Sequence, residues 1–174
     1  MTDALRMRRS GDLRRRRRPV IAAALAAGAV GALGALSTQL GSWYYQLRKP
    51  GWQPPDWLFG PAWTLIFALA ALAAVVYWRR EGDRDSRLLV LVAFTLNGFL
   101  NTLWSLLFFR LHRPDWSLYE VGFLWASILL LMVLLDRASR AAATLLLPYL
   151  AWVSFAAFLN WEIVQLNAPF AGGG

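Results

Sequence analysis

The sequence predicts an all-α integral membrane protein built as a bundle of five transmembrane helices. Of its 174 residues, 58% are hydrophobic and only 16% are charged, whereas a soluble domain carries about a quarter charged residues. The charges are confined to short islands that separate five long charge-poor segments. Each segment has at least 20 residues, which is long enough for a helix to cross the hydrocarbon core of a bilayer.

The first segment follows an arginine-rich arm of residues 1–18. It carries no charge from Pro19 to Leu47, and its predicted helix covers residues 20–41. An arginine-rich start before an apolar run is also typical of a cleaved secretory signal peptide, and Ala35 with Ser37 resembles a cleavage site. The charge-free stretch of 29 residues continues into a Trp-Tyr-Tyr cluster, which favours a helix that stays in the membrane.

The remaining segments predict helices over residues 57–79, 88–109, 116–135 and 141–166, within a membrane domain of residues 19–167 that ends in a short tail of residues 168–174. Leu88–Leu96 and Phe123–Leu135 are apolar around the whole helix circumference, which disfavours the amphipathic helices of a soluble bundle. Strands are disfavoured because the Ala and Leu runs lack period-two alternation and exceed a barrel strand of about 10 residues.

The distribution of Lys and Arg predicts the orientation of the bundle. The N-terminal arm, the loop Arg79–Arg87 and the connection Arg137–Arg140 hold eight, four and two of the eighteen basic residues, and the opposite side holds four. By the positive-inside rule the N-terminus is cytoplasmic and the C-terminus external. The run Arg14–Arg18 is interpreted as attracting anionic lipid headgroups. The expected partner of this arm is therefore the bilayer, and nucleic acid is not an expected partner.

The available residue types restrict the chemistry. No Cys occurs, which excludes disulfides, Cys-ligated metals and thiol nucleophiles. His112 is the only histidine, so a His-rich metal site or a His-based catalytic triad is disfavoured. An imidazole is also a haem ligand, but a lone histidine in a loop is expected to be solvated. No catalytic residue and no metal site are predicted.

Polar and aromatic residues at helical spacing form two stripes that point into the bundle. The stripe on the third helix consists of Asn97, Asn101, Trp104 and Phe108. The stripe on the fifth helix consists of Trp152, Ala156 and Asn160. Because an unpaired amide in hydrocarbon is costly, these amides either bond across helices or face a polar cavity. Glu120 and Glu162 lie near the outer ends of their helices, where they reach water or act as weak pocket candidates.

Tryptophan is concentrated on the predicted external side. Seven of the ten residues lie there, and only Trp78 lies at the inner interface. An interfacial belt is expected at both membrane surfaces. The asymmetry therefore predicts that some of the outer Trp side chains line a cavity.

The loop after the first helix is stiff and aromatic. It carries four prolines within twelve residues, Pro50, Pro54, Pro55 and Pro61. Proline forbids a continuous helix and restricts the backbone. Such a segment predicts a lid over the outer mouth of the bundle, where flat Trp and Tyr rings cover an apolar planar ligand.

Three motifs in order resemble one known family. From Trp43 to Trp63 the chain reads Trp-Tyr-x-x-Leu-x-Lys-Pro-x-Trp-x-Pro-Pro-x-Trp-x-x-x-Pro-x-Trp. From Leu100 it reads Leu-Asn-x-x-Trp-Ser-x-x-Phe-Phe, and from Pro148 it reads Pro-Tyr-Leu-Ala-Trp-x-x-Phe-Ala-x-x-Leu-Asn. Over about residues 20–167 the chain is similar to the translocator protein family, also called tryptophan-rich sensory proteins or peripheral-type benzodiazepine receptors.

This resemblance implies a five-helix membrane protein, often a homodimer, with a ligand pocket beneath the first loop. The implied ligands are porphyrins such as protoporphyrin IX, sterol-like lipids and synthetic isoquinolines or benzodiazepines. The positions that match the family pocket or lie near it are Tyr44, Trp52, Trp63, Asn101, Trp116, Trp152 and Ala156. A cholesterol motif of animal members is not matched, because Trp161 stands where that motif needs Tyr and no basic residue follows.

The expected function is thus a tetrapyrrole-binding receptor, sensor or carrier in a bacterial cell membrane, with the porphyrin as ligand and no required cofactor. The alternative implied by the resemblance is a light-dependent porphyrin-degrading enzyme in which Trp63 and Trp152 take part. A transporter with a charged relay is disfavoured, because no ionisable residue is placed at mid-membrane. Dimer contacts are expected at small-residue stripes, which are Ala24, Gly28 and Ala32, or Ala70 and Ala74.

Overall fold

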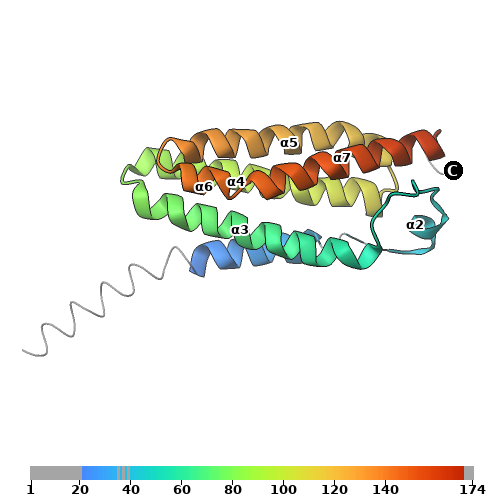
Figure 1. Ribbon diagram of the computed structural model, residues 1–174, viewed down its shortest axis with the longest axis horizontal. Helices are drawn as coiled ribbons and strands as arrows, with labels where there is room; N and C mark the ends of the chain where they lie inside the picture. Colours follow the sequence, from blue (N-terminus) through green and yellow to red (C-terminus); the bar gives the residue numbers. More distant parts are fainter. Residues whose placement is uncertain (1–20, 35, 37, 39, 171–174) are drawn as a thin grey trace, which may run out of the picture.

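The computed structural model describes residues 21–34, 36, 38 and 40–170. Within these residues the regular structure is entirely helical, which confirms the predicted all-α class for the described part of the chain. Figure 1 shows the long helices side by side along one axis. The short helix α2 and the end of α7 lie at one end of the bundle, and the α3–α4 and α5–α6 connections lie at the other.

The helices follow the predicted segments with shifted ends. The first helix covers Ile21–Gly34. The later elements are α2 (Ser42–Gln46), the 3-10 turn η1 (Asp56–Leu58), α3 (Phe59–Arg80), α4 (Arg84–Ser105), the π turn η2 (Leu106–Arg110), α5 (Pro114–Asp136), α6 (Arg140–Thr144) and α7 (Leu147–Asn167).

Four of the five predicted spans are long and apolar enough to cross a membrane: Asp56–Arg80, Arg84–Arg110, Pro114–Asp136 and Arg140–Asn167. The helix Ile21–Gly34 is apolar but shorter than the roughly 20 residues that a span needs. The predicted helix over 20–41 includes residues 20, 35, 37 and 39, which lie outside the described residues, as do the arm 1–18 and residues 171–174. The fifth span therefore stays a prediction.

Local capping explains where α4 and α5 begin. The carboxylate of Asp83 accepts a hydrogen bond from the backbone N–H of Ser86 at 2.7 Å, so α4 begins at Arg84, before the predicted residue 88. An N-cap carboxylate satisfies one of the free N–H groups at a helix start. Pro114 occupies the first turn of α5, where its missing N–H has no intrahelical partner to lose.

The predicted helix over 141–166 lies within one apolar span, Arg140–Asn167, but a short break near its start divides it into two helices. The first, α6, ends at Thr144, and α7 begins at Leu147 with Pro148 in its first turn. A proline ring clashes with the carbonyl four residues earlier and supplies no N–H to bond it. Pro148 therefore interrupts the helix while the apolar character of the span continues.

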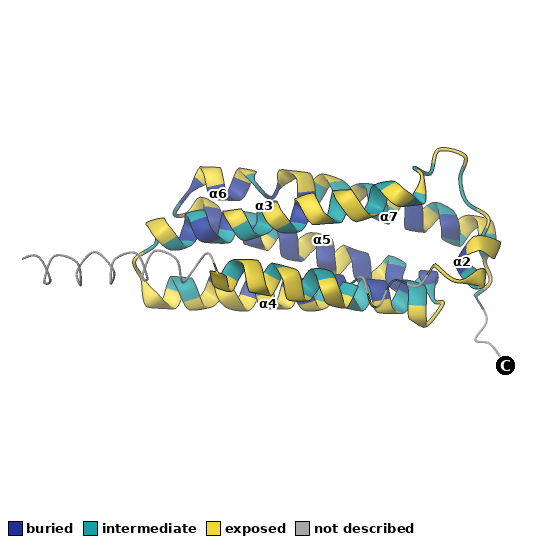
Figure 2. Cartoon of the chain, turned by 90° about the horizontal axis from the view of Figure 1, so that it is seen from below, coloured by how far each residue is buried: buried dark blue, intermediate teal, exposed yellow. Residues whose placement is uncertain are grey.

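The bundle is centred on α5, which packs against α4 and α7, while α3 lies against α6 and the start of α7. The inward face of α5 carries Leu124, Ile128, Leu131 and Leu135, each almost fully buried. Figure 2 shows that the buried residues face the bundle interior and the exposed ones face outward. Many exposed residues are large and apolar, which suits an outer surface covered by lipid.

A hydrogen-bonded network joins α4, α5 and α7 inside the bundle. Nδ2 of Asn97 donates to the Ser127 hydroxyl at 2.8 Å, and the Tyr149 hydroxyl donates to Oδ1 of Asn97 at 3.2 Å. The Asn101 amide nitrogen donates to the Tyr149 hydroxyl at 3.2 Å. Of the two interpretations left open for Asn97, the structure thus supports a bond across helices.

The first helix packs closely on both α3 and α4. A Cβ atom placed on Gly98 would lie 2.9 Å from Cγ2 of Val30, and one placed on Gly31 would lie 3.4 Å from the ring of Phe67. Small residues let two backbones approach in a membrane protein. Gly98 is therefore the residue of α4 against which the first helix rests.

Replacement of Asn97 by Ala is expected to lower the free energy of unfolding by about 0.6 to 1.7 kcal/mol, the range for hydrogen bonds between membrane helices. The substitution leaves the hydroxyls of Ser127 and Tyr149 without their Asn97 partner. Thr95→Ala is the matched control, because the Thr95 hydroxyl donates to the carbonyl of Leu91 in its own helix and to no other helix of the described residues. Reversible unfolding in mixed detergent measures both, and equal losses would contradict the proposed role of Asn97.

Candidate functional site

A cavity of about 490 Å³ lies beneath the first loop, between α3, α4, η2 and α7. Its size falls within the range of small-molecule sites, roughly 300 to 1,000 Å³. Five of the seven residues predicted to bind ligand line its wall: Tyr44, Trp63, Asn101, Trp152 and Ala156. The structure thus brings together residues that are more than 100 positions apart in the sequence, while their binding role stays a prediction.

The other two predicted residues lie outside this wall. Trp52 stacks on Phe158 with ring centroids 5.2 Å apart and lies edge-on to Phe155 at 5.8 Å. Trp116 is exposed on α5, with the Arg113 guanidinium 4.3 Å from its ring centre. Their sequence positions match the family, but Trp52 packs on the outer face of α7. Trp116 lies on α5, a helix that does not line the cavity.

Aromatic rings that pack on one another form part of the cavity wall. Trp63 stacks on Phe67 with centroids 5.4 Å apart, and Trp104 stacks on Phe108 at 5.3 Å. Phe59 meets Trp152 edge-on at 5.6 Å. Offset and edge-on pairs of this kind hold one another in place. The wall therefore presents flat apolar surfaces of fixed orientation. Trp104 and Phe108, which belong to the stripe predicted on the third helix, do line this cavity.

A few polar atoms of the lining residues have no partner within the described part of the chain. They are Nε1 of Trp104, Nε1 of Trp152 and Oε1 of Gln53, all of them buried. Buried polar groups are nearly always hydrogen-bonded. Two indole donors and one amide acceptor therefore remain unpaired on residues that line the cavity, and they are covered by neighbouring atoms.

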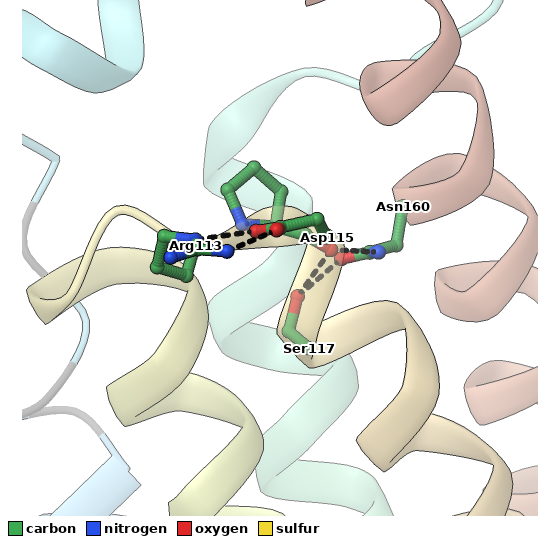
Figure 3. A network of polar contacts seen from close by, with 5 residues as sticks. Arg113, Asp115, Ser117 and Asn160 are labelled. Atoms are coloured by element: carbon green, nitrogen blue, oxygen red, sulfur yellow. Dashed lines mark hydrogen bonds and ion pairs between the residues drawn. The ribbon is translucent and has the colours of Figure 1, made fainter. Parts of the chain in front are cut away.

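Asn160 also lines the cavity, but its amide holds α7 against α5. Its nitrogen donates to the carbonyl of Pro114 at 2.9 Å, and its oxygen accepts from the Ser117 hydroxyl at 2.8 Å. Figure 3 shows this contact beside the ion pair of Arg113 with Asp115 at the start of α5. Because both ends of the Asn160 amide are occupied, its role here is structural.

Tyr44 organises the loop over the cavity. Its hydroxyl donates to Oδ1 of Asp56 at 2.8 Å and accepts from the Gln53 amide at 3.2 Å. The Lys49 ammonium lies 3.5 Å above the Tyr44 ring. Burial, together with the hydrogen bond to the Asp56 carboxylate, raises the pKa of the Tyr44 hydroxyl above its ordinary value. Tyr44 therefore keeps its proton and remains a donor to Asp56.

The loop is also fastened to the far end of α7. The backbone N–H of Arg48 donates to Oδ1 of Asn167 at 2.8 Å, and Nδ2 of Asn167 donates to the Arg48 carbonyl at 2.8 Å. Sequence reasoning missed Asn167, Asp56 and Gln53. Single polar side chains are common at turns and helix ends. The local sequence pattern therefore gave no sign that these three residues hold the loop in place.

The remaining charged candidates lie away from the cavity wall. Glu120 is buried on α5, and neither carboxylate oxygen has a partner within the described residues, so the expectation that it reaches water is wrong. The turn of α5 that carries it faces the bundle interior. Glu162 is partly buried and lies outside the wall.

His112 stacks on Trp43 with ring centroids 4.2 Å apart. Over residues 21–34, 36, 38 and 40–170, three or more His, Cys, Asp or Glu side chains do not gather in any place where they would hold a metal ion.

Comparison with known proteins identifies the family. Residues 20–166 match the model of the TspO/MBR family. The tryptophan-rich protein TspO of Chlorobaculum tepidum is 41% identical over 141 residues, which cover 80% of this chain and 89% of that protein. The corresponding protein of Archaeoglobus fulgidus is 40% identical over 86% of this chain and 97% of its own length. The human translocator protein is 31% identical over 75% of this chain and 78% of its own length. With four membrane-length apolar helices and these matches, the chain belongs to the TspO/MBR family of integral membrane proteins.

Proposed function

We propose that this protein is a membrane sensor or carrier that binds a tetrapyrrole, such as protoporphyrin IX, in the cavity beneath the first loop. The observation that carries the proposal is the wall of stacked rings around about 490 Å³. A planar, mostly apolar ligand needs apolar surfaces with a few well-placed polar groups. The cavity has that composition, and flat rings of fixed orientation suit a flat ligand.

The unpaired polar atoms supply orientation. Nε1 of Trp104 and Nε1 of Trp152 are buried without a partner in the described residues. A buried donor left unsatisfied costs about 1 to 3 kcal/mol. In this proposal the two indole rings shift when the ligand enters, so that a ligand carboxylate or carbonyl oxygen accepts from their N–H groups and relieves that cost, whereas a pure hydrocarbon does not. This supports a tetrapyrrole with acidic side chains over an apolar sterol.

The lid controls access in this proposal. Tyr44, which lines the cavity, is held by Asp56 and Gln53, and Asn167 holds the loop at Arg48. Release of the ligand requires at least one of these contacts to open. Sterol-like and isoquinoline molecules that fit the same apolar walls enter by the same route.

The alternative function is light-dependent degradation of the bound porphyrin. It is favoured by the position of Trp63 and Trp152, because their oxidisable rings line the same cavity. Porphyrin titration in the dark followed by illumination and product analysis separates the two functions. A binder returns the porphyrin unchanged relative to a protein-free sample, whereas an enzyme yields a new product.

Trp63→Ala and Trp152→Ala are each expected to weaken protoporphyrin IX binding by about tenfold or more, since each removes an aromatic contact and its buried area. Ala156→Phe is expected to block the cavity sterically. Absorbance and fluorescence titration of the purified protein in detergent measures the affinity.

Trp78→Ala is the control for these three variants, because Trp78 lies at the opposite end of the bundle. It is expected to leave porphyrin affinity nearly unchanged. Equal losses for Trp78→Ala and the cavity variants, in proteins of equal helix content, would show that the porphyrin binds elsewhere.

Asn167→Ala is expected to speed porphyrin release several-fold, because it removes both hydrogen bonds that hold the loop at Arg48. Stopped-flow competition measures the release rate. Gln165→Ala is the matched control, since this exposed side chain on the same turn of α7 does not line the cavity. A release rate that is unchanged in Asn167→Ala would contradict the role of the loop as a lid.

The proposed orientation places the cavity and lid outside the cell, and the basic connections inside. Reporter fusions are expected to locate the loop Arg79–Arg87 in the cytoplasm and the C-terminus outside. The reason is that fourteen of the eighteen basic residues lie on the side of this loop, and basic residues stay in the cytoplasm. A cytoplasmic C-terminus in a full-length fusion would contradict either the orientation or the count of five spans.

A further inference from the structure

A second, larger hollow lies at the opposite end of the bundle from the lid. It is a groove of about 1,400 Å³ between the helix Ile21–Gly34, α3 and α4. Small side chains on two of these helices form its facing walls, which include Ala22, Ala26, Ala70 and Ala74. Because alanine leaves space beside the backbone, the groove can take a long apolar chain.

The end of the groove near the α3–α4 connection is positively charged. Trp78, Arg79 and Arg87 line it. Arg87 donates from Nη2 to the carbonyls of Trp78 and Glu81, and its guanidinium lies 5.3 Å from the Trp78 ring. Its Nε remains buried without a partner among the described residues. The Arg87 guanidinium is therefore held in place beside the groove, with one of its N–H groups unpaired.

Two acidic residues of that connection accept hydrogen bonds from its own backbone, and a third, Asp85, lies in the first turn of α4 outside the groove. Asp83 caps α4 through the N–H of Ser86, and the Glu81 carboxylate accepts from the N–H of Asp83. Neither lines the groove, so both charged side chains that do line it are arginines. The groove thus combines apolar walls with a cationic mouth.

The length of the groove matches half of a bilayer. It follows the first helix from Ala22 to Leu33, which corresponds to about 17 Å at 1.5 Å per residue. One leaflet of a hydrocarbon core about 30 Å thick measures about 15 Å. At mid-bundle the groove reaches Phe67, which also lines the outer cavity, so that one aromatic ring stands between the two hollows.

We infer that this groove binds an anionic phospholipid from the leaflet at its arginine end. The phosphate pairs with Arg79 and Arg87, Trp78 lies at headgroup level as interfacial Trp residues do, and one acyl chain follows the alanine walls toward Phe67. A second copy of this chain could fill the apolar walls, but the apolar walls alone do not account for the two arginines at the mouth of the groove. Charge complementarity therefore selects the lipid.

Native mass spectrometry of the full-length protein in mild detergent tests the headgroup contact, with dioleoyl phosphatidylglycerol and dioleoyl phosphatidylcholine as probes. Phosphatidylglycerol is expected to bind more tightly. Arg79→Gln is expected to lower its affinity about fivefold, the effect of one basic residue near an anionic headgroup, and to lower that of phosphatidylcholine less, because the choline cation offsets the charge of the same phosphate. Arg80→Gln is the matched control, because Arg80 is the next residue, is exposed and lies outside the groove. Equal losses in the two variants would overturn the site in favour of diffuse attraction.

The acyl-chain contact is tested by Ala74→Leu, which fills the groove, against Ala68→Leu on the exposed side of the same helix. Ala74→Leu is expected to lower the affinity of both lipids at least threefold, and Ala68→Leu is expected to leave both unchanged. If Ala74→Leu alters the monomer–dimer equilibrium but not lipid binding, a second copy occupies the groove and the proposal fails. If Ala74→Leu loses helix content, the comparison of Arg79→Gln with Arg80→Gln decides alone.

Discussion

The arrangement of this bundle depends on one constraint, which is that an amide inside hydrocarbon must find a hydrogen-bond partner. Tyr149 meets it by donating to Asn97 and accepting from Asn101, while Asn97 in turn donates to Ser127. These bonds fix α4, α5 and α7 relative to one another. Since these bonds join the three helices, the spaces that remain lie beside them, next to α3 and the first helix, and these are the two hollows.

A helix break places Tyr149 in this network. Pro148 interrupts the backbone hydrogen bonds between α6 and α7 and lies in the first turn of α7. Tyr149 therefore occupies the first turn of a new helix and points into the bundle. Three residues further on, Trp152 reaches the outer cavity on the next turn. The proline therefore determines both the internal bonds and one wall of the candidate site, although an apolar span needs no proline to cross a membrane.

The two hollows differ in the chemistry of their polar atoms. The outer cavity offers neutral donors, the indole N–H groups of Trp104 and Trp152, within stacked rings. The other hollow offers guanidinium groups at one end of an alanine-lined groove. Neutral donors favour a ligand whose polar groups are few and spread over a flat body, and fixed cations favour a concentrated anionic headgroup. The same bundle thus presents two kinds of site on either side of Phe67.

The sequence by itself determined the helical class, four membrane-length spans and the family, because hydrocarbon requires long apolar helices and because three spaced motifs identify the TspO/MBR family. It also placed Trp63, Asn101 and Trp152 on faces that do meet, since helical spacing fixes the direction of each side chain. Only the tertiary structure decided where Trp52 and Trp116 lie, that Glu120 is buried, and that Asn167 holds Arg48 across 119 residues. The direction of a side chain on a proline-rich loop depends on what it packs against, and a contact between distant segments leaves no local periodicity from which to predict it.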